Sequence, residues 1–123
     1  MDTVKLTLGE KDYYLEINFK AAYAFSTKVK DPAHIFSQFA RHDETWLTLP
    51  NLVKSIQCAL DSHGVKKSID DIGEAIYKHN QKNEIISQIT EYICLLAMGG
   101  RAPSKKKSEM AQELPKIPQS NGS

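Results

Sequence analysis

The side chains best suited to metal binding or nucleophilic catalysis in this chain are four histidines and two cysteines. The histidines are His34, His42, His63 and His79, and the cysteines are Cys58 and Cys94. Zinc sites usually include two ligands a few residues apart, but none of these residues stands three or four positions from another. We therefore predict no metal site and no cofactor. His63 and His79 fall near expected helix ends, where a positively charged imidazole is stabilised without a ligand.

The other reactive groups form no catalytic pattern. Cys94 lies in the apolar run 92–96, where a thiol behaves as a small hydrophobic side chain rather than as a nucleophile. The glycines are isolated or follow a helix, so they form no phosphate-binding loop. Asp70 and Asp71 stand at an expected helix start, where capping explains them more simply than acid–base catalysis does. We predict that the protein is not an enzyme.

The most basic stretch is Lys105, Lys106 and Lys107, in a segment rich in proline, serine and glutamine. Residues 100–123 carry five Lys+Arg and two Asp+Glu, a net charge of +3, whereas residues 1–99 carry 11 and 13, a net charge of −2. Three lysines could contact nucleic acid phosphates or an acidic protein surface, or could only keep the chain soluble. Without neighbouring aromatic residues they are a weak signal for nucleic acid, so we do not expect nucleic acid as a partner.

Composition and length predict one globular domain over residues 1–99, followed by a flexible basic tail over residues 100–123. The chain has 123 residues, 41% of them hydrophobic and 25% charged, with a net charge of +1. Few apolar residues in the tail are available to offset the entropy cost of ordering it. The start of the chain lacks the pattern of a signal peptide, and the apolar run 92–98 is too short to span a bilayer. We expect a cytoplasmic protein with reduced cysteines and no membrane partner.

Two alternating segments open the chain. Residues 4–8 and 12–17 both alternate apolar and polar side chains, and a turn containing Gly9 separates them. Period 2 on both sides of a glycine turn predicts a β-hairpin. An isolated hairpin is only marginally stable in water, so its apolar face must pack on the helical segments that follow. The predicted fold class is α+β, with an N-terminal β-hairpin packed on about five helices.

Capping residues and a period of 3.6 place these helices at about 19–29, from 32, at about 50–63, from 69, and at about 83–98. Asn18, Asp31 and Ser68 are the expected N-caps. Apolar side chains at helical spacing are expected to face the core. In chain order they are Phe19, Ala22, Tyr23, Ser26 and Val29; Ile35, Phe36 and Phe39; Leu52, Val53, Ile56, Ala59 and Leu60; Ile69, Ile72 and Ile76; and Ile85, Ile86, Ile89, Ile93 and Leu96.

The last helix is apolar nearly all the way round from residue 92 to residue 98. Such a helix is either buried on several sides in one domain or shared with a partner. Aromatic residues are enriched at partner surfaces. On the second interpretation, Tyr92, Leu95 and Met98 are candidate partner-binding residues, together with Lys105, Lys106 and Lys107. A homo-oligomer is one possible outcome.

The order of these parts resembles the tail assembly chaperones of siphophages and prophages. The resemblance is carried by the strand–glycine turn–strand opening over residues 4–15, by the helix start Phe19-Lys20-Ala21-Ala22-Tyr23, and by the helix over residues 52–60 followed by Ser68-Ile69-Asp70-Asp71-Ile72. It covers roughly residues 3–98. It implies a non-catalytic protein of the host cytoplasm that binds the phage tape measure protein, helps recruit tail tube subunits and is not part of the mature virion. The alternative is a small regulatory or nucleic-acid-associated protein that uses its basic C-terminal tail.

Overall fold

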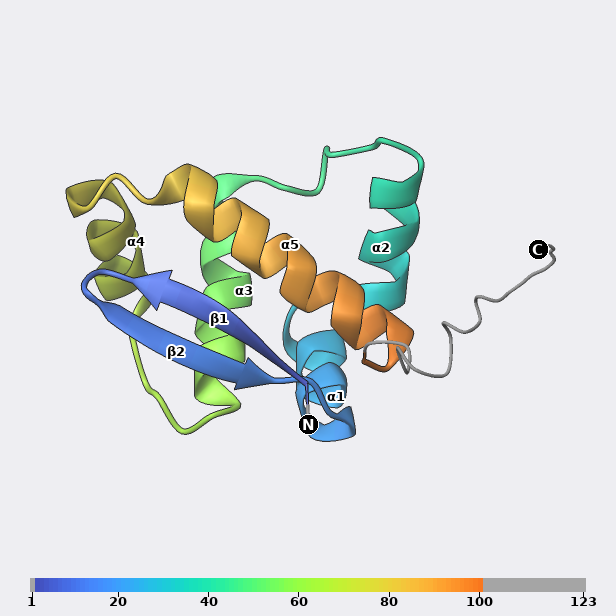
Figure 1. Ribbon diagram of the computed structural model, residues 1–123. Helices are drawn as coiled ribbons and strands as arrows, with labels where there is room; N and C mark the ends of the chain where they lie inside the picture. The colour runs from blue at the N-terminus through green and yellow to red at the C-terminus, as the bar shows by residue number, and fades with distance from the viewer. Residues whose placement is uncertain (1, 101–123) are drawn as a thin grey trace, which may run out of the picture.

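A computed structural model describes residues 2–100, and within them the fold is α+β, a hairpin followed by five helices (Figure 1). The predictions for the tail, including those for Lys105, Lys106 and Lys107, lie outside the described residues. The helices are α1 (Phe19–Lys28), α2 (Pro32–Ala40), α3 (Leu49–Asp61), α4 (Ile69–Lys78) and α5 (Lys82–Met98). The predicted fold class is therefore confirmed.

The hairpin consists of β1 (Thr3–Leu8) and β2 (Lys11–Glu16), which pair antiparallel with Val4 opposite Leu15. Gly9 begins the turn with a φ of 68°, a left-handed conformation that glycine adopts without steric cost. The alternation places one face of each strand in the core. Val4, Leu6, Leu8 and Leu15 are buried on that face, as the period-2 pattern predicts.

The predicted N-caps are confirmed. The side-chain oxygen of Asn18 accepts a hydrogen bond from Ala21 N at 2.8 Å, Asp31 caps Ala33 N at 3.0 Å, and Ser68 caps Asp71 N at 3.0 Å. At the other end of the last helix, Gly99 takes a left-handed φ of 77°. Its N–H donates back to the last turn, and this ends α5 at Met98.

Helix α5 is the centre of the domain. Figure 1 shows it crossing the molecule from beside α4 to beside α1, with the hairpin against it. It contacts β1 and each of the other four helices. Its buried side chains are Ile85, Ile89, Tyr92, Ile93, Leu95 and Leu96. Of the two interpretations of this apolar helix, the core helix is the one that the structure supports.

Polar side chains from α5 and from residues next to the helix ends form hydrogen bonds to the backbone of the hairpin. The Gln81 side-chain amide accepts from Gly9 N at 2.8 Å and donates to Gly9 O at 2.9 Å. Gln88 Oε1 accepts from Thr7 N at 2.9 Å. His63 Nε2 accepts from Glu16 N at 2.6 Å, and Nδ1 lies 2.9 Å from Ala59 O. Both ring nitrogens of His63 are therefore used in contacts that join β2 to the end of α3.

Five positions that the sequence predicts to face the core are exposed instead, and one of them is Ser26 of α1. In α1, Ala21 and Phe25 are buried, whereas Phe19 and Tyr23 are exposed. Phe36 in α2 and Ile69 at the start of α4 are also exposed. Helix α1 is apolar on two faces, so the sequence pattern alone does not decide which face packs. The structure resolves this by inserting Phe25 against Tyr92 of α5, with ring centroids 6.3 Å apart in an edge-to-face arrangement.

Two further observations concern the described residues as a whole. No helix in residues 2–100 combines the length and the apolar character needed to cross a membrane. The first and last described residues lie together, because a side chain added at Gly100 would stand 3.0 Å from Asp2 Oδ2.

Candidate functional site

Two of the predicted partner-binding residues belong to the core. Tyr92 is 0% exposed and Leu95 is 6% exposed, so neither presents a surface to a partner, and this part of the prediction is wrong for the folded domain. The physical reason is the position of α5, because β1 and the other four helices pack against the side that carries Tyr92 and Leu95. Met98 is exposed, as predicted, and it stands at the last position of α5.

Met98 is part of an apolar surface that also includes α1. We call it the α1–α5 surface and define it as Phe19, Ala22 and Tyr23 of α1 with Leu96, Ala97 and Met98 of α5. Phe19 is 81% exposed, Tyr23 is 62% exposed and Met98 is 56% exposed. Large apolar side chains gathered on one face of a small domain are typical of an interaction site.

The geometry of this surface suits an apolar partner. The rings of Phe19 and Tyr23 lie next to each other on α1, one turn apart, with centroids separated by 5.8 Å. Beside them are two hollows of about 460 and 180 Å³, which share Phe19, Ala22, Leu96 and Ala97 in their walls. Asp31 is the charged residue in these walls, and its carboxylate is occupied in capping α2. Ion pairing therefore contributes little here, whereas aromatic and methionine side chains provide adaptable contact area.

A second apolar hollow lies between the beginning of α3 and α4. This α3–α4 groove, of about 640 Å³, is lined by Leu49, Pro50, Val53, Ile69 and Tyr77, with Gly73 and the charged Lys54, Asp70 and Glu74 among its other walls. Its exposed apolar side chains are those of Leu49, Ile69 and Tyr77. Unlike the α1–α5 surface, it combines apolar walls with both signs of charge.

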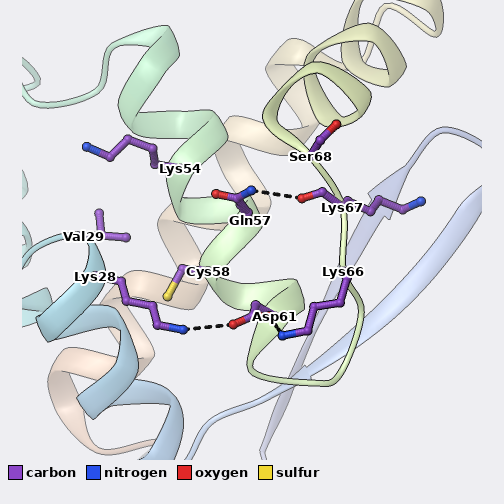
Figure 2. A pocket seen from close by; sticks show the side chains of 9 residues that line it. All are labelled: Lys28, Val29, Lys54, Gln57, Cys58, Asp61, Lys66, Lys67 and Ser68. Carbon is purple, nitrogen blue, oxygen red and sulfur yellow. Dashed lines mark hydrogen bonds and ion pairs between the residues drawn. The ribbon is translucent and has the colours of Figure 1, made fainter.

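Lysines line the third concave feature, a cavity of about 490 Å³ between the end of α1, α3 and the link from α3 to α4 (Figure 2). We call it the lysine cavity. Lys28 Nζ forms an ion pair with Asp61 Oδ2 at 2.9 Å, and Lys66 pairs with the other oxygen of the same carboxylate. Hydrogen bonds from Lys66 and Lys28 lower the pKa of Asp61 to about 2, and Asp61 in turn raises the pKa of Lys28.

Within residues 2–100, no three His, Cys, Asp or Glu side chains gather into a group that could hold a metal ion. Cys58 and Cys94 are free thiols, and burial raises the pKa of both. A raised pKa leaves less of the reactive thiolate at neutral pH.

Comparison of the chain with protein-family models, with curated proteins and with solved structures found no match. The resemblance to tail assembly chaperones therefore stays a prediction.

The sequence reasoning missed Phe19 and Tyr23 as site residues. The usable signal was their spacing, since i and i+4 positions share one helix face. Phe25 offers α1 a second apolar face, with Ala21 one turn before it. A helix with two apolar faces in a small domain can bury only one of them, and the other then becomes a candidate surface for partners.

Proposed function

We propose that this protein is a non-catalytic tail assembly chaperone that binds a phage tape measure protein through its α1–α5 surface and helps recruit tail tube subunits. On this proposal it acts in the host cytoplasm and is not part of the mature virion. The observation that carries the proposal is the exposed group of Phe19, Tyr23 and Met98 beside two hollows. The resemblance in element order supplies the identity of the client.

The chemistry of the surface fits such a client. A long helical protein that is not yet enclosed presents stripes of apolar side chains, and a chaperone for it needs apolar contacts that adapt to many positions along the helix. Methionine and paired aromatic rings meet that need, because they gain contact area without requiring one fixed geometry. An amphipathic helix placed in a shallow apolar groove is a common recognition mode.

The experiment is co-expression of a candidate tape measure protein with this chain and with paired variants of it. Tyr23→Ser, in the α1–α5 surface, is expected to abolish co-elution on gel filtration and to return the client to the insoluble fraction. Tyr77→Ser is the matched control, because Tyr77 is also helical and 63% exposed, against 62% for Tyr23, but lies in the α3–α4 groove. Circular dichroism must show both variants folded.

Three outcomes would contradict the proposal. The client is equally soluble with and without the chain, or Tyr23→Ser binds as well as the parent chain, or Tyr77→Ser alone loses binding. Salt-dependent binding to arbitrary DNA that requires Lys105, Lys106 and Lys107 would favour the alternative, a nucleic-acid-associated protein using its basic tail.

A further inference from the structure

The proposed function makes no use of the lysine cavity. We propose that this cavity binds a small phosphate-bearing anion, such as inorganic diphosphate, through the lysines that line it, Lys28, Lys54 and Lys66. These three lysines come from α1, from α3 and from the link between α3 and α4, so the fold brings together residues far apart in the sequence. The cavity has about 490 Å³, within the usual size range of small-molecule sites.

Positive charge is in excess at this cavity. Figure 2 shows Lys28 and Lys66 approaching Asp61 from two sides, whereas the Lys54 side chain extends from α3 along another wall, with its ammonium group directed away from Asp61. Lys67 points away from these residues, and its carbonyl accepts a hydrogen bond from Gln57 Nε2 at 3.0 Å. Counting the three lysines against the one carboxylate gives 3 − 1, a net charge of +2, which suits a ligand with at least two negative charges.

The lysines keep donors available for a ligand. An ammonium group has three N–H donors, and Lys28 and Lys66 are each shown with one acceptor, a different oxygen of Asp61. Within residues 2–100 Lys54 has no ion pair that competes with a ligand. Asp61 therefore holds two ammonium groups near one point without using all their donors, and a phosphate group between them would accept charge-assisted hydrogen bonds.

The beginning of α4 contributes little to this site. Ser68 lines the cavity, but its side chain already accepts from Asp71 N, and Asp70 and Asp71 place negative charge in the first turn. The lysines are therefore the recognition elements, and binding should follow lysine charge.

The probe is inorganic diphosphate at physiological salt, titrated into the full chain and followed by calorimetry and by backbone amide shifts. We expect one saturable site whose largest shifts surround Lys28, Cys58 and Lys66. Lys54→Gln should weaken binding by about tenfold, the usual effect of one charge-assisted hydrogen bond. Lys54 makes no ion pair in residues 2–100, so this variant should fold normally.

Two control variants make the test selective. Lys5→Gln, on the hairpin, should leave the affinity unchanged, and so should replacement of Lys105, Lys106 and Lys107 together by glutamine. An absence of saturable binding, an unchanged affinity in Lys54→Gln, or a loss that is equal in Lys5→Gln overturns the proposal. Loss of binding in the triple variant also overturns it, by assigning the anion to the tail. None of these outcomes involves Tyr23, so the chaperone proposal is tested separately.

Discussion

At the scale of single residues, the hydroxyl group of Tyr92 is a polar atom in an apolar part of the core. Within residues 2–100 it has no hydrogen-bond partner, and burial raises the pKa of this phenol. An unpaired buried hydroxyl lowers stability by about 1–3 kcal/mol. Tyr92→Phe keeps the ring against Phe25 and should therefore increase the free energy of unfolding by about 1 kcal/mol in urea titration. Tyr77→Phe, at an exposed position, is the control that should not change it.

Asp61 gives the domain a predictable response to acid. Its pKa in the folded protein is about 2, below the usual 3.8, so its ionised form stabilises the fold. That contribution is complete above about pH 4 and is lost as the pH falls towards 2. The stability difference between the parent chain and Asp61→Asn should therefore be largest near neutral pH and shrink below pH 4. A difference that stays constant from pH 7 to pH 2 would contradict the assigned ion pairs.

Leu95 and Met98 lie on the same helix, but Leu95 is buried in the core and Met98 is exposed on the surface. Leu95→Asp places a carboxylate among α5's buried neighbours, where an unpaired charge is strongly destabilising, and should unfold the domain. Met98→Asp, one turn later at an exposed position, should leave the circular dichroism spectrum and melting temperature nearly unchanged. A folded Leu95→Asp variant that had only lost association would restore the interface interpretation of this residue.

At the scale of elements, the hairpin depends on Gln81, which follows α4. Its side chain makes two hydrogen bonds to the backbone of Gly9 and so fixes the turn between β1 and β2. Gln81→Ala should lower the free energy of unfolding by about 1–3 kcal/mol, since each bond contributes about 0.5–1.5 kcal/mol. Asn83→Ala, at an exposed position two residues later, should change it by less than about 0.5 kcal/mol. Equal changes in the free energy of unfolding in the two variants would contradict a stabilising role for the Gln81–Gly9 hydrogen bonds.

At the scale of the whole molecule, the sequence predicts the elements better than it predicts how they face one another. The hairpin and the helix starts follow from local rules, because alternation, N-caps and a terminal glycine act within a few residues. The orientation of α1 does not follow from them, since Phe25 and Tyr23 are both aromatic candidates for the core. The choice is made by the tertiary packing, in which Phe25 lies against Tyr92 of α5. The lysine cavity could not be predicted from local sequence patterns either, because its lysines line one cavity only after α1 and α3 pack together.

The contact between β1 and α5 joins the first and last elements of the domain, and it has a consequence for synthesis on the ribosome. The backbone N–H of Thr7 donates a hydrogen bond to Gln88 Oε1, which lies 81 positions later in the chain. The apolar face of β1 can therefore be covered by α5 only after α5 has been synthesised. At about 5–20 residues per second this delay is roughly 4–16 s. During that interval the nascent hairpin should be cut by a protease in stalled ribosome complexes that lack α5, and it should become resistant once α5 has emerged.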